Sequence, residues 1–356
     1  MGKNKPHHIL VIRLSAMGDV AMTVPVLLAL TQQYPGLKIT VLTKVFFSPI
    51  FSQIPNVTVY AADVKGKHKG VLGLYRLFKE LKNINVDAVA DLHNVLRSNV
   101  LKVFFSLGGY RFMQIDKGRS NKKKLISGHL KVLKALKTSH QRYAEVFKKL
   151  GYKVDLNKVV LLNNITVSSD LKKQLNLDSK PWVGIAPFAA FQGKTYPTYL
   201  MNEVLNQLNK TNTCQIILFA GKAETKQCTT WEASYSNIFS VVGKFSLKEE
   251  LQLISNLDVM ISMDSGNGHL AANYGVPIIT LWGLTHPSAG FAPFGQDAKQ
   301  QILADRTEFP LIPTSIYGNK MPAGYQKAME TIAPEQICEK ILEILNVRSV
   351  LRKNNR

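Results

Sequence analysis

The chain has 356 residues, of which 46% are hydrophobic, so it is long enough for two domains with full cores. No apolar stretch approaches the roughly 18 residues that span a bilayer, and three widely spaced cysteines argue against a disulfide framework or a zinc site. The net charge of +21 indicates an anionic partner for the first half, because residues 1–178 hold 29 basic and 10 acidic residues and the remainder holds 16 and 14.

Strands and helices alternate through the first half. Residues 71–82 carry apolar side chains at helical spacing. The aromatic residues Phe104, Phe105, Tyr110 and Phe112 have a spacing that favours a packed core over base stacking. We expect strands at residues 8–13, 38–42, 57–60, 86–91 and 111–115.

The first strand runs into a polar loop before a helix. The apolar run of residues 9–12 is followed by Arg13, Ser15, Gly18 and Asp19. A tight turn at Gly18 would aim Asp19 into a cleft, toward a ligand. The alternative is that Asp19 is only an acid at a helix start, where it favours the helix dipole.

The second half shows the same alternation, with strands expected at residues 182–186, 214–220, 238–242, 258–263 and 278–282. Alternation of this kind predicts an α/β protein with two doubly wound parallel sheets. The expected organisation is a first domain at 1–165, a polar linker at 166–180, a second domain at 181–330, a closing helix at 331–347 and a loose basic tail at 348–356.

Two apolar runs flank a short helix between residues 257 and 285. Asp264, Ser265 and Gly266 follow the first run, and Asn267 is the expected N-cap. This placement puts them at the carboxyl edge of a parallel sheet, where α/β proteins hold phosphate groups. His269 lies one turn into the helix and is able to face the same anion. The alternative is a strand-to-helix turn with nothing bound.

Other readings of the motifs fail at single positions. Gly193-Lys194-Thr195 is not a P-loop, because Phe188 occupies the position of the required glycine. Gly-x-Gly-x-x-Ala from Gly266 lacks the acid about 20 residues later that a dinucleotide fold needs. The nucleophile elbow of a hydrolase would need glycine at position 263, which is Met263 in this chain. The chain has no Asp-x-Asp pair, which disfavours metal-dependent glycosyl transfer.

Two motifs together resemble the heptosyltransferases of lipopolysaccharide assembly. They are Arg13-Leu-Ser-Ala-Met-Gly-Asp19 with Pro25, and Asp264-Ser-Gly-x-x-His269-Leu-Ala-Ala272. The resemblance implies a GT-B architecture, with two Rossmann-like domains facing across a cleft. It also implies an inverting, metal-independent glycosyltransferase that moves a heptose from ADP-heptose to a lipid A/Kdo-type core acceptor. The family's usual proline–methionine pair is Asn267-Gly268 here, which predicts a looser phosphate loop.

The resemblance also implies roles for individual residues. Asp19 is the expected general base. The expected donor-binding residues are Lys194 at the diphosphate, Glu224 at the ribose hydroxyls, Val242 at the base pocket, and Asp264, Ser265, Gly266 and His269. The expected acceptor-binding residues are Arg13, Ser15, Lys117, Arg119, Lys122, Lys123 and Lys124. For Lys194 and Glu224 the alternatives are an exposed loop lysine and a helix-start glutamate that need no ligand.

The charge and the resemblance together define the expected partners. We expect a cytoplasmic monomer, peripheral to the inner membrane, with no cofactor, no metal and no nucleic-acid partner, acting on an anionic glycolipid. A family member that uses another nucleotide sugar stays open as an alternative. So do a basic α/β protein that binds nucleic acid and a nucleotide-sugar sensor without turnover.

Overall fold

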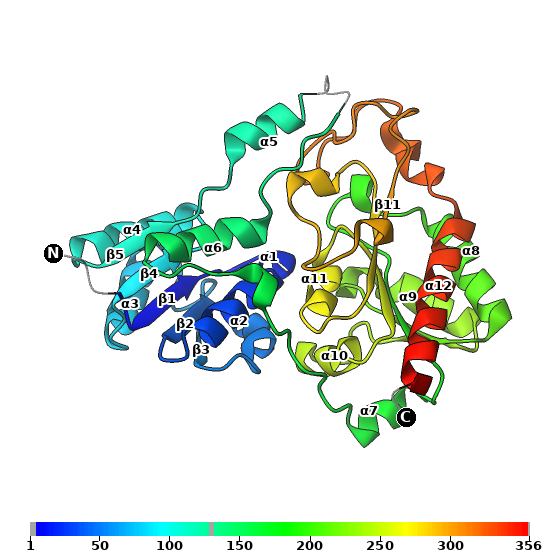
Figure 1. The fold of residues 1–356 in the computed structure, drawn as a ribbon, viewed down its shortest axis with the longest axis horizontal. Helices are drawn as coiled ribbons and strands as arrows, with labels where there is room; N and C mark the ends of the chain where they lie inside the picture. The colour runs from blue at the N-terminus through cyan, green and yellow to red at the C-terminus, as the bar shows by residue number, and fades with distance from the viewer. Residues whose placement is uncertain (1–4, 128–131, 355–356) are drawn as a thin grey trace. The chain divides into compact units, whose positions relative to one another are not determined.

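The computed structural model describes residues 5–127 and 132–354. It divides into two compact units, one formed by residues 1–119 and 137–162 and the other by residues 120–136 and 163–356. Each unit contains one parallel sheet with helices packed on it (Figure 1). The predicted fold class, α/β with two parallel sheets, is therefore confirmed.

The sheet of the first unit has the strand order β3-β2-β1-β4-β5. Its strands are β1 (His8–Ile12), β2 (Lys38–Thr43), β3 (Val57–Ala61), β4 (Ala88–Asp91) and β5 (Arg111–Gln114), close to the predicted ranges. Ile12 pairs with Leu42 on one side and with Asp91 on the other, so all carboxyl ends meet at one edge. The strand order reverses between β1 and β4, and such a switch point is where α/β sheets bind ligands.

Helices cover both faces of this sheet. They are α1 (Met17–Ala21), α2 (Val24–Gln33), α3 (Gly70–Lys82), α4 (Leu96–Leu107) and α6 (Ser139–Lys149), with short 3₁₀ turns η1 (Val45–Phe51) and η2 (Leu156–Lys158). Leu74, Leu77 and Leu81 of α3 pack with Phe105 of α4 over Leu10 of β1. Phe105 is fully buried, and Phe104, Tyr110 and Phe112 pack against the same cluster. Their predicted role as core residues is confirmed.

The sheet of the second unit has the order β11-β10-β9-β6-β7-β8. Its strands are β6 (Trp182–Ala186), β7 (Gln215–Leu218), β8 (Ile238–Ser240), β9 (Val259–Met263), β10 (Ile278–Trp282) and β11 (Gln301–Leu303). Five of these lie in the predicted ranges. The sequence pattern missed β11, because three residues are too few to show an alternation. Here the strand order reverses between β6 and β9.

The helices of the second unit include a longer C-terminal helix than expected. They are α5 (Arg119–Leu125), which begins at the boundary, α7 (Ser169–Gln174), α8 (Thr198–Thr211), α9 (Thr225–Ser234), α10 (Leu247–Ile254), α11 (Gly266–Ala272) and α12 (Pro334–Asn354), with 3₁₀ turns η3 (Gln192–Lys194), η4 (Lys222–Glu224), η5 (Pro287–Ala289), η6 (Ala298–Gln300) and η7 (Tyr325–Thr331).

The prediction of a loose tail from Arg348 is wrong for residues 348–354, which continue α12. Arg348 donates to the carbonyl oxygens of Leu257 and Asp258 at 2.9 and 2.8 Å, which holds this part of the helix on the unit. The last two residues of the predicted tail lie outside the described residues.

Two segments belong to the second unit although the sequence placed them elsewhere. Residues 120–136 were expected in the first domain, but Leu125 packs with Ala289 and Ile316, and the Leu136 amide donates to the Ser288 carbonyl at 2.8 Å. The expected linker contains α7, and the Ser168 amide just before it donates to Gln252 at 3.2 Å. These long-range contacts leave no local signature in the sequence.

Among residues 5–127 and 132–354, no helix is both long enough and apolar enough to span a bilayer.

Candidate functional site

An ion pair stands at the switch point of the first sheet. Arg13, which directly follows β1, pairs with Asp19 of α1. The other terminal nitrogen of Arg13 donates to the Leu92 carbonyl at 2.7 Å, and the guanidinium lies 6.0 Å from the centre of the Tyr143 ring. The Arg13 side chain is buried, whereas the Asp19 side chain keeps 33% of its surface exposed. The arginine therefore fixes a carboxylate that a ligand can still reach.

The end of β4 brings a second polar group to this edge. Asp91 accepts hydrogen bonds from the His93 amide at 2.8 Å and from Gln114 at 2.8 Å, which shapes the turn after the strand. His93 is buried, and its pKa falls to about 3 because of burial and the nearby charges of Arg13 and Lys117. The imidazole is therefore neutral at pH 7. Sequence reasoning missed both residues, although Asp91-Leu-His93 directly follows a predicted strand.

A buried lysine–aspartate pair marks the switch point of the second sheet. The Lys194 ammonium lies 2.8 Å from the Asp264 carboxylate, and their side chains are only 14% and 8% exposed. Thr285, which sequence reasoning also missed, donates to the same carboxylate oxygen at 2.9 Å. The three residues come from the loops after β6, β9 and β10, so the sheet topology brings them together.

Small residues allow a loop to cross the Lys194 side chain. Gly318 has a φ of +76°, and a Cβ there would lie 2.4 Å from Cγ of Lys194. A Cβ on Gly193 would lie 3.0 Å from the Gly318 carbonyl oxygen. Two glycines far apart in the sequence are therefore needed to confine the Lys194 side chain. The sequence pattern singled out Gly193 but not Gly318.

The helix after β9 begins two residues earlier than expected. α11 starts at Gly266, so Ser265 occupies the N-cap position and the predicted N-cap role of Asn267 is wrong. The Ser265 hydroxyl oxygen is buried and has no hydrogen-bond partner within the described residues. His269 is buried on the same short helix. An unused buried hydroxyl is costly unless something bonds to it, so Ser265 is a suitable donor for an anion.

Gly268 has a packing role. A Cβ at this position would lie 2.5 Å from the Ser262 hydroxyl oxygen, which in turn donates to the Met263 carbonyl at 2.9 Å. The missing side chain thus allows α11 to rest on β9. This contact gives a structural reason for the glycine at position 268, where the family usually has the methionine of its proline–methionine pair.

We expect Gly268→Ala to lower the free energy of unfolding by about 1–3 kcal/mol, because the added methyl overpacks the contact with Ser262. The double variant Gly268→Ala/Ser262→Ala should recover part of this loss, since it removes the oxygen that the methyl meets. Urea unfolding of the two variants and of Ser262→Ala alone measures the coupling. Strictly additive losses would contradict this account.

The remaining predicted donor residues lie along the same sheet edge. Glu224 ends the η4 turn after β7 and is half-buried, and Val242 follows β8 and is buried. Ser246 caps α10, accepting from the Glu249 amide while Glu249 accepts from the Ser246 amide at 2.7 Å. Because the edge runs β9-β6-β7-β8, Glu224 and Val242 extend from the Lys194–Asp264 pair toward β8.

The structure separates the predicted basic cluster into two groups. Lys117 belongs to the first unit, is half-buried, and has its pKa lowered by burial and by Arg13 and Arg119. Lys122 belongs to the second unit and is buried, with its ammonium 4.2 Å from the centre of the Phe291 ring. Arg119, Lys123 and Lys124 are exposed, and Ser15 is half-buried. An acceptor role for these residues stays a prediction.

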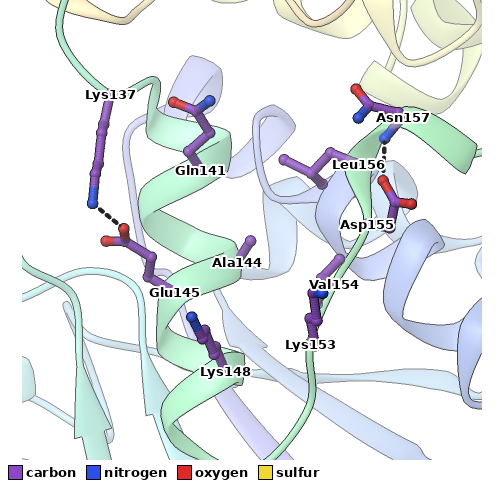
Figure 2. A pocket seen from close by; sticks show the side chains of 10 residues that line it. All are labelled: Lys137, Gln141, Ala144, Glu145, Lys148, Lys153, Val154, Asp155, Leu156 and Asn157. Atoms are coloured by element: carbon purple, nitrogen blue, oxygen red, sulfur yellow. Dashed lines mark hydrogen bonds and ion pairs between the residues drawn. The ribbon is translucent and has the colours of Figure 1, made fainter.

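A separate hollow of about 590 Å³ lies in the first unit between α6 and residues 153–157 (Figure 2). Glu145 pairs with Lys137 at its rim, and Asp155 accepts from the Asn157 amide at 3.0 Å. None of the predicted site residues lines it. Within the described residues, no group of three or more histidine, cysteine or acidic side chains is placed to hold a metal ion.

Comparisons with known proteins show the family and the fold of the chain. The family model described as glycosyltransferase family 9 (heptosyltransferase) matches residues 74–310. The lipopolysaccharide core heptosyltransferase OpsX of Haemophilus influenzae is 26% identical over 290 residues, covering 79% of this chain and 80% of that protein. A glycosyltransferase family 9 structure from Veillonella parvula superposes with a TM-score of 0.73 at 19% identity, covering 97% and 98% of the two chains. The E. coli heptosyltransferase WaaC solved with ADP gives a TM-score of 0.65 at 20% identity, covering 95% and 99%.

Proposed function

Because the chain belongs to glycosyltransferase family 9, the heptosyltransferases, we propose that it transfers a heptose from ADP-heptose to a lipopolysaccharide core acceptor. The reaction inverts the anomeric carbon and needs no metal. The observation that carries the proposal is the Lys194–Asp264 pair at the switch point between β6 and β9. The relative WaaC was solved with ADP, which supports an adenine nucleotide as the leaving group.

The second unit holds the donor in this proposal. The diphosphate lies at the helix start at Gly266 and faces Lys194. The Ser265 hydroxyl, which has no partner within the described residues, donates a hydrogen bond to the diphosphate. Glu224 accepts from the ribose hydroxyls, and Val242 contributes to the wall of the base pocket. Asp264 keeps Lys194 in place until the anion binds. Preorganised donors of this kind stabilise the charge that develops on a leaving diphosphate.

The first unit supplies the base. A hydroxyl of the acceptor sugar forms the new bond to the anomeric carbon while Asp19 takes its proton. The bond from the anomeric carbon to the diphosphate breaks in the same step, and ADP leaves with the electron pair. Arg13, which pairs with Asp19, orients the base in this proposal, and Ser15, Lys117 and the exposed Arg119 contact anionic groups of the acceptor. Lys122 contacts these anionic groups only if its ammonium moves away from the Phe291 ring.

A panel of ADP, UDP, GDP and CMP tests the donor assignment by thermal shift. A nucleotide at 100 times its dissociation constant adds about 2.7 kcal/mol of stability, which raises the melting temperature by a few degrees. We expect this shift for ADP alone. Stabilisation by UDP or GDP instead would replace the sugar nucleotide, and no response to any of the four would contradict the donor site.

A further inference from the structure

An exposed aromatic side chain lies beside the proposed diphosphate contact of the second unit. Tyr317 is 56% exposed, and it directly precedes Gly318, the glycine that passes over the Lys194 side chain. Its other neighbour, Ile316, is buried in a small apolar cluster. A single exposed aromatic residue is ordinary, but this one is held between two residues that are both fixed against the rest of the unit.

The loop that carries Tyr317 is closed by hydrogen bonds. The Thr314 hydroxyl donates to the Lys320 carbonyl at 2.6 Å, which joins the two ends of the loop. The Thr314 amide donates to the Leu284 carbonyl at 3.0 Å, which attaches the loop to the segment after β10. The Tyr317 ring lies against Phe291, with the ring centres 6.4 Å apart. The ring is therefore held before any ligand binds, and a preorganised side chain loses less freedom on binding.

The strand order of the second sheet separates the two ends of a nucleotide sugar. The order is β11-β10-β9-β6-β7-β8, and the Lys194–Asp264 pair comes from the loops after β6 and β9. The proposed ribose and base contacts, Glu224 and Val242, follow β7 and β8 on one side of this pair. The diphosphate lies between the nucleoside and the sugar, so we expect the sugar on the opposite side of the pair, toward β10.

The loop of Tyr317 lies on this β10 side. Thr285 follows β10, and a Cβ on Gly318 would lie 3.5 Å from Cγ2 of Thr285. Phe291, which the Tyr317 ring contacts, belongs to the segment between β10 and β11. An aromatic face suits a pyranose, because the axial C–H bonds on one face of the sugar form an apolar surface while the hydroxyl groups around its edge stay hydrated.

We propose that Tyr317 selects the transferred sugar by stacking its ring on the C–H face of a pyranose whose diphosphate lies on Lys194. This inference rests on the proposed function, and it assigns the sugar contact that the donor residues above leave open. A stacked pyranose covers part of the Tyr317 ring that ADP alone leaves in water. The ring therefore contributes to the affinity for the nucleotide sugar and not to the affinity for ADP.

Isothermal titration of the full chain with ADP and with ADP-heptose, in the absence of acceptor, tests this assignment. We expect Tyr317→Ala to bind ADP-heptose about tenfold more weakly than the wild type, the loss typical of one aromatic contact with its buried apolar area, and to bind ADP equally well. Tyr317→Phe should keep the wild-type affinity for both ligands, because it retains the ring.

Tyr199→Ala is the matched control. Tyr199 is 55% exposed and lies in the first turn of α8, where the acids that act on it are Glu330 and Glu203 rather than Asp264. We expect this variant to bind both ligands as the wild type does.

Several results would overturn the assignment while the wild type still binds ADP and the proposed function stands. Equal losses of ADP and ADP-heptose affinity in Tyr317→Ala would mean that the tyrosine only supports the loop over Lys194. Unchanged ADP-heptose affinity in Tyr317→Ala, an equal loss in Tyr199→Ala, or a Tyr317→Phe variant as weak as Tyr317→Ala would also contradict stacking. A wild type that binds neither ligand would overturn the proposed function and this assignment with it.

Discussion

Replacing Asp19 with asparagine is expected to lower turnover by about 10²–10⁴-fold while leaving the nucleotide shift unchanged. The amide cannot take the proton of the acceptor hydroxyl, and loss of a general base costs a factor of this size. The donor residues lie in the other unit, so ADP binding should not change. Single-turnover assays with saturating donor and acceptor measure the effect on the chemical step.

A matched control distinguishes catalysis from helix stabilisation. Asp170 is an exposed acid in the first turn of α7, so Asp170→Asn removes a comparable interaction with a helix dipole without touching either sheet edge. We expect this control to keep full turnover. If Asp19→Asn also keeps it, Asp19 is only a helix-start acid. Thermal unfolding of both variants shows whether any loss of rate comes from instability, since Asp19→Asn leaves the buried Arg13 without its anion.

Lys194→Ala is expected to weaken ADP binding by about 10–100-fold, because a hydrogen bond to a charged group contributes about 1.5–3 kcal/mol. The same variant should lower the free energy of unfolding by about 3–5 kcal/mol, since it leaves the buried Asp264 carboxylate without its counter-charge. Isothermal titration with ADP and urea unfolding measure the two effects separately.

The double variant Lys194→Ala/Asp264→Asn separates these two effects. It removes the unpaired buried charge, so most of the stability should return, whereas ADP affinity should stay low. Lys222→Ala is the matched control, because Lys222 is an exposed lysine in the η4 turn of the same unit. Unchanged ADP affinity in Lys194→Ala, or equal losses of affinity in Lys194→Ala and Lys222→Ala, would contradict the proposed diphosphate contact.

The fold could be predicted from local patterns because buried parallel strands are short apolar runs with polar residues at their ends. All five strands predicted in the first half lie within about two residues of the observed bounds. The Ser246 cap was also predictable, because a serine and a glutamate three residues apart satisfy each other's backbone amides within one turn. The short β11 and the start of α11 were not, since three residues or a single cap position carry too weak a signal.

The candidate site could be predicted only as separate segments. Asp19 and Asp264 follow apolar runs, and the rule that ligands bind at the carboxyl edge selected their two loops. Lys194 was selected by the family resemblance. His93, Thr285 and Gly318 were missed because their importance comes from what lies beside them. Gly318 matters only because Lys194, more than a hundred residues earlier in the chain, passes beneath it.

The sequence by itself determined every strand except β11, the alternation of strands with helices, the two motif loops and the excess of positive charge in the first half. Periodicity, capping and charge are properties of neighbouring residues, so they can be read without a fold. Only the tertiary structure decided that Lys194 pairs with Asp264, that Arg13 pairs with Asp19, and that residues 120–136 pack with the second unit. Strand order sets the first of these contacts, because β6 and β9 are neighbours in the sheet, and strand order depends on the burial of whole sheets.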